Sequence, residues 1–393
     1  MKLILTLLVL VAAAIGQQDT VQQDNLLTEA SNQFTAKMFS EVVMSNPNKS
    51  VVLSAFSVFT PLAQLSLASE GATHDELLTA IGLRNDIDTK AAFPRLNDKL
   101  QSVRGIELKT ASKIYVAEHF ELNPEFSDVI KDVFKSEVKN VDFTKNTETA
   151  KEINSWVEDQ TNKRIKDLVS ADSLDSDTRS VLVNAIYFKG LWNRPFNNEN
   201  TEEEDFHVSK DKTIKVPMMH IRSFFSYYDS VELNAQVLEL PYSGLQASFI
   251  VILPKEVDGL DALVEKLKDP SALTSATSKM STFTVNVALP KFKIETEINL
   301  KDVLKKLDVK RIFEPQQAQL SRLLKSGERL YVSKAVQKAF IEVNEQGAEA
   351  ATGNAFRPVA LSMPPPAKFT ANHPFVFVLK AGDNTLFNGV YHS

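Results

Sequence analysis

Apolar positions along the chain recur with two different periods. Over residues 25–43 they recur every fourth residue, which places them on one face of a helix: Leu26, Ala30, Phe34, Met38 and Val42. Over residues 282–289 they instead alternate with polar residues, at Phe283, Val285, Val287 and Leu289. Alternation indicates a half-buried strand. The chain therefore combines helices and strands.

The same periods predict further elements. Helices are expected over residues 53–68, 150–169 and 300–307, and strands over 180–188, 237–240, 248–253, 335–343 and 375–379. Ser54 is suited to be the N-cap of the first of these helices. The sequence PYSG at 241–244 predicts a hairpin between two of the strands. Helices dominate early and strands late without a βαβ rhythm, so we predict an α+β protein with large mixed or antiparallel sheets.

The first 16 residues have the pattern of a secretory signal peptide. A basic start at Lys2 precedes an apolar run over residues 3–15, and Ala14 and Gly16 are the small residues before a cleavage site. The run is too short to span a bilayer. The alternative is a buried N-terminal helix. We expect cleavage after Gly16 and a secreted, extracellular chain over residues 17–393.

Composition and charge exclude several classes of protein. Hydrophobic residues make up 43% of the chain and charged residues 24%, as in an ordinary globular protein. The net charge is −6, so there is no basic excess and nucleic acid is not an expected partner. No later segment reaches 18 uninterrupted apolar residues, so no membrane span is expected. The absence of cysteine excludes disulfides and thiolate chemistry.

No pattern of residues predicts an enzyme. The six histidines have no paired spacing that would hold a metal ion, and no Gly-x-Ser-x-Gly nucleophile motif occurs. We therefore expect no catalytic residues, no metal and no cofactor. The sequence Asn48-Lys49-Ser50 is a glycosylation sequon, and we expect a glycan at Asn48.

A long connection without periodicity stands out at residues 345–367. It begins with the small residues of EQGAEAA and contains Pro358 and a run of three prolines at 364–366. Structureless connections of this length are uncommon and tend to be functional or disordered. An exposed loop is also where proteases cut. Two interpretations remain open on physical grounds: a loop presented to proteases, or one that is cut without consequence.

Several segments, in order along the chain, resemble the serpins, a family of serine protease inhibitors. The segments are EVNEQGAEAAT at 342–352, NAIYFKG at 184–190 with Trp192 and Phe196, FH at 206–207, VPMM at 216–219, LELPY at 238–242, PKF at 290–292, and HPF at 373–375 with Phe387 and Gly389. They cover essentially the whole chain after residue 16. The chain is most similar to the secreted insect antitrypsin and antichymotrypsin type.

The resemblance implies a fold and a mechanism. It implies a single domain of about nine helices and three β-sheets, with an exposed reactive-centre loop at about 345–367. A serine protease would cut the loop and form an acyl-enzyme, and the loop would then insert into the large sheet and trap the protease. The hinge of the loop corresponds to Glu345, Gly347, Ala348, Glu349, Ala350, Ala351 and Thr352. Ala348, Ala350 and Thr352 are small enough to enter a sheet with their side chains inward.

Family spacing places the reactive bond at Leu361-Ser362. Leu361 suits the apolar primary pocket of chymotrypsin-like or elastase-like proteases. Two features count against smooth insertion: Pro358 lacks an N–H for a ladder, and Asn354 and Phe356 are large.

Other positions match regions that control insertion in the family. Lys291 and Glu345 resemble its breach salt bridge under the hinge, and Trp192 belongs to the same breach motif. Ser54, Ser57, Asn184 and Gln337 resemble its shutter, where the sheet parts. Ala55 replaces a usual proline and Gln337 a usual histidine.

The resemblance also bears on partners. Lys90, Arg95, Lys99 and Arg104 fall where some serpins bind heparin, but acidic residues are interleaved with them, so a glycosaminoglycan is not the expected partner. The expected partner is an extracellular serine protease, bound covalently by a monomer. The alternative is a non-inhibitory serpin with a carrier or storage role.

Overall fold

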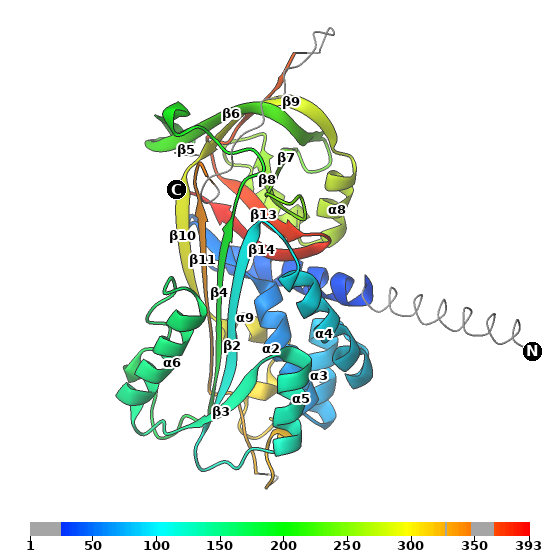
Figure 1. Ribbon diagram of the computed structural model, residues 1–393, viewed down its shortest axis with the longest axis vertical. Helices are drawn as coiled ribbons and strands as arrows, with labels where there is room; N and C mark the ends of the chain where they lie inside the picture. Colours follow the sequence, from blue (N-terminus) through cyan, green and yellow to red (C-terminus); the bar gives the residue numbers. More distant parts are fainter. Residues whose placement is uncertain (1–24, 327, 347–364) are drawn as a thin grey trace, which may run out of the picture.

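The computed structural model describes residues 25–326, 328–346 and 365–393 (Figure 1). Within these ranges there are nine α-helices: residues 25–44, α2 (Ala55–Ala68), α3 (Gly71–Ile81), α4 (Asp86–Gln101), α5 (Pro124–Phe134), α6 (Asn146–Gln160), α7 (Leu260–Lys266), α8 (Pro270–Ser278) and α9 (Leu300–Lys306). Four single turns of 3-10 helix occur at Ala171–Ser173, Asn198–Asn200, Arg311–Phe313 and Ser321–Leu323. In the part of the chain that is described, no helix is long and apolar enough to cross a membrane.

One sheet has five strands in the order β10-β11-β4-β2-β3. Their bounds are β10 (Phe292–Asn299), β11 (Lys334–Val343), β4 (Ser180–Gly190), β2 (Ile106–Ala117) and β3 (Glu137–Val141). The central neighbours β11 and β4 are parallel, whereas β10 and β2 pair antiparallel on either side of them. Ten of the eleven residues of β4 are buried. This accounts for its continuous apolar sequence, because a central strand is covered on both faces.

The other sheet has nine strands in the order β1-β14-β13-β8-β7-β6-β9-β12, with β5 also paired to β6. Their bounds are β1 (Val51–Leu53), β5 (Thr201–Ser209), β6 (Lys212–Ser230), β7 (Ala235–Pro241), β8 (Ala247–Pro254), β9 (Ser281–Pro290), β12 (Ala367–Thr370), β13 (Phe375–Ala381) and β14 (Asn384–Tyr391). Hydrogen bonding among the described residues thus gives two sheets instead of the three expected. The reason is that β6, with 19 residues, pairs with β5 and β9 in one part and with β7 in the next.

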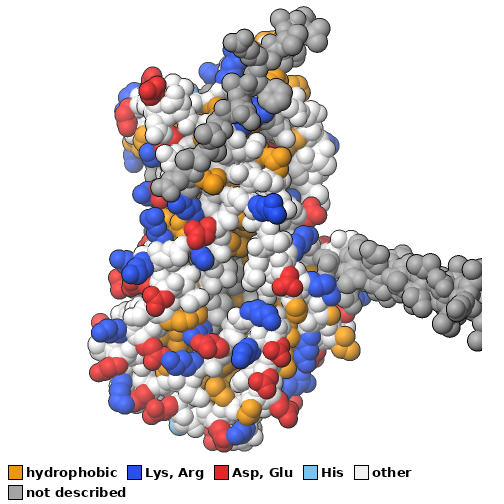
Figure 2. Space-filling model, viewed as in Figure 1, with side chains coloured by type: hydrophobic (Ala, Val, Ile, Leu, Met, Phe, Trp, Pro, Cys, Tyr) orange, Lys and Arg blue, Asp and Glu red, His pale blue; other side chains and the backbone are white. Residues whose placement is uncertain are grey.

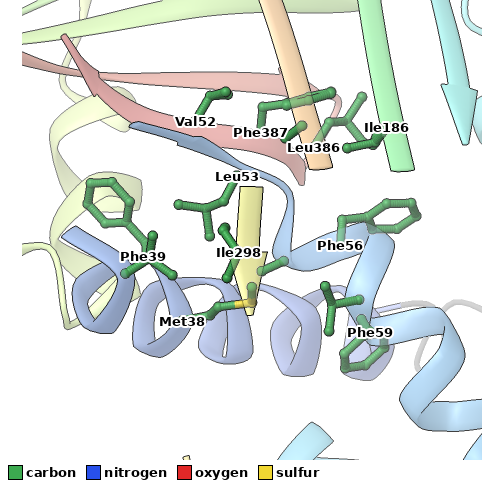
Figure 3. Packing of buried hydrophobic residues seen from close by; sticks show 14 of the residues in the cluster. Met38, Phe39, Val52, Leu53, Phe56, Phe59, Ile186, Ile298, Leu386 and Phe387 are labelled. Carbon is green, nitrogen blue, oxygen red and sulfur yellow. The ribbon is translucent and has the colours of Figure 1, made fainter. Parts of the chain in front are cut away.

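The core lies between the two sheets and the helices that pack on them. Helix α2 contacts β2 and β4 of the five-stranded sheet and β14 of the nine-stranded sheet. Figure 3 shows side chains from the helix at 25–44 and from α2, β1, β4, β10 and β14 meeting in this region: Met38, Phe39, Val52, Leu53, Phe56, Phe59, Ile186, Ile298, Leu386 and Phe387. Segments far apart in sequence therefore share one apolar interior.

Most of the elements predicted from periodicity are confirmed. The α+β class, the helix over 25–44 and the strands β4, β9, β11 and β13 are as expected. Ser54 caps α2, because its hydroxyl accepts a hydrogen bond from the Ser57 N–H at 3.1 Å. The predicted hairpin forms between β7 and β8, which pair antiparallel.

The helix predicted over residues 150–169 is wrong in its second half. Helix α6 ends at Gln160, and Asn162 and Lys163 adopt left-handed backbone angles that turn the chain back. The Asn154 side chain then holds the returning segment by two hydrogen bonds of 2.9 Å to the backbone of Val169. The apolar spacing continued past the turn because Ile165 is buried from a loop.

Strands also occur earlier than the pattern indicated. Strands β2 and β3 lie in the first half of the chain, before α6. Their sequences mix charged and apolar residues, because only part of each strand is buried. The long strand β6 has the same mixed character and was not predicted either.

Candidate functional site

The five-stranded sheet has a polar cluster at its centre. Gln337 on β11 stands opposite Asn184 on β4 in the parallel register. Ser54 and Ser57 come from the start of α2, beneath these two strands. All four side chains are buried, and we call them the shutter cluster. The structure thus brings together the four residues that the sequence placed in this region.

The shutter cluster is dense in hydrogen bonds. The Ser57 hydroxyl lies 2.6 Å from Asn184 Oδ1, and the Asn184 amide donates to the Ser57 carbonyl at 2.8 Å. Gln337 Nε2 lies 2.8 Å from both the Ser54 carbonyl and Asn184 Oδ1, and 2.9 Å from the Ser57 hydroxyl. Each such bond is worth only about 1 kcal/mol net, but a buried group left without its partner costs about 1–3 kcal/mol. The cluster therefore favours the arrangement in which β4, β11 and α2 stay together.

At two positions of this region, the chain differs from the residues that are usual in the serpins it resembles. Gln337 takes the place of the usual histidine, and its amide both donates to the cluster and accepts from the Ser54 N–H at 3.4 Å. Glutamine can do this at any pH because its amide does not titrate. Ala55, where proline is usual, is the first residue of α2 and is buried. Proline is favoured at a first helical position but is not required there.

A second cluster lies where β11 ends. Lys291 Nζ is 2.9 Å from Glu345 Oε2, and Thr201 donates to Glu345 Oε1 at 3.0 Å. The backbone N–H of Phe196 donates to the Glu345 carbonyl at 2.8 Å. Glu345 is thereby held through both its side chain and its backbone. This fixes the direction in which the chain leaves the sheet.

Trp192, which follows β4 in the chain, contacts the same region. Its indole N–H donates to the Asn344 carbonyl at 2.8 Å, and its ring stacks on Tyr242 with centroids 4.6 Å apart. The Tyr242 ring lies so close to Gly190 that a Cβ there would approach it to 2.6 Å. We call Lys291, Trp192 and Glu345 the breach cluster. It ties the end of β11 to the ends of β4 and β10.

The Glu345 carboxylate remains ionised in this setting. Burial acts to raise its pKa, but the hydrogen bonds from Lys291, from the Glu345 backbone N–H and from Thr201 together outweigh burial and hold the pKa below its ordinary value. An ionised Glu345 keeps the contact with Lys291 at neutral pH.

Two members of this region were not identified from the sequence as site residues. Tyr242 lies in the quoted segment LELPY, so its stacking on Trp192 had a signal in the sequence. Thr201 begins a surface strand of acidic residues, and nothing in the sequence pattern pointed to its contact with Glu345.

The rest of the proposed loop lies outside the described residues. Of the hinge residues, Glu345 is described, whereas Gly347, Ala348, Glu349, Ala350, Ala351 and Thr352 are not. The reactive bond Leu361-Ser362 and the segment 1–16 also lie outside the described ranges. The chain is described again from Pro365, and β12 then pairs with β9.

The sequon and the basic segment both lie at the surface. Asn48 is exposed in a turn with a φ of 59°. Lys90, Arg95 and Lys99 lie on α4, and Arg104 follows it. Figure 2 shows basic and acidic side chains interspersed over the visible face of the molecule. Among the described residues, no group of three potential metal ligands is found.

The fold and the two clusters define a class of protein, and comparison with known families agrees. The family model described as "Serpin (serine protease inhibitor)" matches residues 29–393. This chain therefore belongs to the serpin family, whose members include proteins named as protease inhibitors.

Comparison with individual proteins shows which serpins this chain is similar to. The chain is 56% identical over 370 residues to antichymotrypsin-2 of Bombyx mori, covering 94% of this chain and 98% of that one. It is 52% identical to antitrypsin of Bombyx mori over the whole of both chains. The crystal structure of Serpin48 from Tenebrio molitor superimposes with a TM-score of 0.84 at 35% identity, covering 94% of this chain and 98% of that one. The expected likeness to insect antitrypsins and antichymotrypsins is confirmed.

Proposed function

We propose that this serpin is an extracellular suicide inhibitor of serine proteases. A protease cleaves the bond Leu361-Ser362 and forms an acyl-enzyme, and the loop from Glu345 onward then inserts between β4 and β11. Insertion carries the attached protease away and distorts its active site before the acyl bond is hydrolysed. The apolar side chain of Leu361 favours chymotrypsin-like or elastase-like targets.

The observation that carries the proposal is the parallel pairing of β4 with β11 at the centre of the sheet. The loop follows the C-terminal end of β11, so a segment that folds back from there runs antiparallel to both strands. Its insertion would replace one parallel pairing by two antiparallel pairings. Antiparallel pairing is slightly more stable per residue, and the number of ladder hydrogen bonds increases. The sheet topology thus supplies a driving force for insertion.

The hinge composition supports the same step. An inserted strand buries alternate side chains, and if Ala348 faces inward then Ala350 and Thr352 do so as well. None of these three is bulky or charged. Gly347 supplies backbone freedom next to Glu345, at the last residues that the breach cluster holds.

The shutter and breach clusters would act as the two restraints on this movement. The Gln337–Asn184 contact joins β11 directly to β4, so it must break before a strand can enter. The Lys291–Glu345 ion pair holds the point where the loop departs. A protease-inhibiting serpin needs restraints that hold until the loop is cut and then yield.

A gel assay distinguishes inhibition from simple cleavage. Incubation with chymotrypsin should yield a complex that survives denaturing electrophoresis, and the released C-terminal peptide should begin at Ser362. Leu361→Arg should weaken inhibition of chymotrypsin and create inhibition of trypsin, because a guanidinium pairs with an acidic primary pocket. Cleavage of the parent by chymotrypsin without any stable complex would instead assign the non-inhibitory carrier or storage role.

Secretion and glycosylation belong to the same proposal. N-terminal sequencing of the protein from the culture medium should begin at Gln17. A mature protein that retains residues 3–15 would contradict the proposed signal peptide. Asn48 is exposed, as a glycan requires, so glycosidase treatment of the secreted protein should lower its mass and Asn48→Gln should remove that shift.

A further inference from the structure

One exposed face of the nine-stranded sheet carries two cations beside the point where the loop returns. Arg222 on β6 stands opposite Asn286 on β9, and Asn286 stands opposite Lys368 on β12. Residues opposite one another in neighbouring strands project from the same face. The three residues therefore form one row across three strands, which we call the cationic row. All three are exposed, and strand spacing of about 4.8 Å puts the two cationic residues about 10 Å apart.

An apolar rim adjoins the cationic row. Phe224 lies two residues along β6 on the same face and is 38% exposed, whereas its neighbour Phe225 points the other way and is buried. Phe224 and the exposed Leu245 line a hollow of about 340 Å³. Arginine and aromatic side chains are the types enriched at protein–protein interfaces. The face therefore has the composition of a contact surface.

The described residues around the row do not pair with its positive charges. Within the described ranges, neither Arg222 nor Lys368 forms an ion pair with a carboxylate. Three carboxylates lie on the same face: Glu204 is 2.8 Å from His220, Glu202 stands opposite Met218, four residues from Arg222 along β6, and Glu239 stands opposite Ser226, beyond Phe224. An acidic surface that approaches this face would meet two available cations.

We infer that the cationic row and Phe224 form an auxiliary docking surface for an acidic patch on the target protease. The inference rests on the proposed function, and its geometry follows from chain length. Lys368 is six residues after Ser362, so it lies within about 21 Å of the reactive bond. A protease domain of about 230 residues has a radius of gyration of about 17 Å. A protease bound at Leu361-Ser362 is therefore large enough to reach the outer face of β12 and β9.

The docking surface acts on encounter and not on trapping. Charges at the rim of an interface mainly change the association rate, and salt suppresses their effect. The strands that carry the row belong to the nine-stranded sheet, whereas the loop inserts into the other sheet. Altering the row should leave the yield of covalent complex unchanged.

The test compares association rates of matched variants with two chymotrypsin-like proteases, one with an acidic and one with a basic isoelectric point. Arg222→Glu combined with Lys368→Glu should slow association with the acidic protease about tenfold at 50 mM NaCl, and by less than about twofold at 1 M NaCl. The same variant should associate with the basic protease at least as fast as the parent. Phe224→Ala should weaken the encounter complex with both proteases at either salt concentration.

The control carries the same change of net charge elsewhere. Lys131→Glu combined with Lys151→Glu alters exposed lysines on α5 and α6, at the opposite end of the molecule from β6 and β9 (Figure 1). Equal association rates for the two double variants would overturn the docking surface and assign any effect to net charge. A normal rate with a lower yield of complex would also overturn it. If the parent forms no covalent complex with either protease, the proposed function fails instead.

Discussion

The centre of the five-stranded sheet and the joint between the two sheets are held together by different forces. Between β4 and β11, the contact beneath the strands is the polar shutter cluster, in which Gln337, Asn184 and Ser57 share hydrogen bonds. At the joint, Phe292 of β10 packs against Phe377 of β13 and stacks on Tyr391 of β14 with centroids 4.7 Å apart. The hydrogen bonds of the shutter cluster depend on the direction of the donor and acceptor groups, whereas the aromatic packing at the joint depends mainly on the area that is buried.

In the proposed mechanism, this difference gives the five-stranded sheet a fixed edge and a separable centre. Hydrogen bonds of the shutter cluster exist in one arrangement, and a small displacement of β11 from β4 breaks several of them together. The aromatic contacts at β10 lose free energy only in proportion to the area that becomes exposed. We expect β10 to stay attached to the nine-stranded sheet while β4 and β11 part. Five measurements test this comparison.

Cleavage of the loop should produce the largest effect. A non-target protease that cuts near residue 361 frees the loop to enter between β4 and β11. About ten new hydrogen bonds at about 1 kcal/mol each would raise the melting temperature by at least about 10 °C. Calorimetry before and after cleavage measures this. An unchanged melting temperature would mean that the two strands do not separate.

Ala348→Arg should abolish trapping without preventing cleavage. An arginine at the first inward position would bury a charge without a partner, at a cost of several kcal/mol. Acylation should stay fast, so the protein becomes a substrate and the stoichiometry of inhibition rises steeply. Glu349→Arg is the matched control, because position 349 should face outward and tolerate the change. Equal loss in both variants would contradict the alternating register.

Phe377→Ala tests the joint between the sheets. Phe377 is fully buried and contacts both Phe249 and Phe292. Its truncation should lower the free energy of unfolding by about 3–5 kcal/mol, whereas Leu245→Ala, at an exposed position, should change it by less than about 0.5 kcal/mol. Urea unfolding gives both values. The rate of loop insertion into the cleaved protein should not increase in proportion to the stability lost.

Gln337→Ala tests the shutter cluster, where we expect a smaller loss of stability but faster loop insertion than in Phe377→Ala. Loss of the amide leaves buried acceptors unpaired and should cost about 1–3 kcal/mol. In contrast to Phe377→Ala, the variant should insert its loop spontaneously on mild heating, which is detected as loss of inhibition without cleavage. Gln337→His is the control and should restore the restraint near pH 8, where the imidazole is neutral. Spontaneous insertion at the parental rate in the alanine variant would remove Gln337 as a restraint.

Glu345→Gln should have the smallest effect, about 1 kcal/mol at pH 7. The pKa of Glu345 is lowered in the folded protein from a usual value of 4.5, so its contribution is fully present above pH 4.5 and is lost as the pH falls through the lower folded value. Parent and variant should therefore differ in stability at pH 7 and converge in acid. Glu265→Gln, in an exposed pair with Lys268, should show no measurable difference at either pH. A parent–variant difference that does not change with pH would mean that the ionised form of Glu345 is not what holds Lys291.

Much of the fold could be predicted from local pattern. The apolar spacing of residues 25–43, the apolar run of β4 and the alternation of β9 each predicted the correct element, because each periodicity matches the face that is buried. Prediction failed where the spacing of apolar residues does not match the pattern of buried residues. In α6 the apolar spacing continued beyond a turn that Asn154 stabilises, and in β2 and β6 partial exposure weakened the alternation.

The candidate site likewise has one part that could be predicted from the local sequence and another part that could not. The sequence by itself determined the family, and it predicted the small residues of the hinge and the four residues of the shutter cluster, because short motifs and side-chain size can be read locally. Only the tertiary structure decided that Gln337 meets Ser54 across 283 positions and that Thr201 supports Glu345 across 144. It also decided that Arg222 and Lys368 lie in one row. These contacts depend on strand order and register, which are set by the packing of the whole chain and not by the residues on either side of each position.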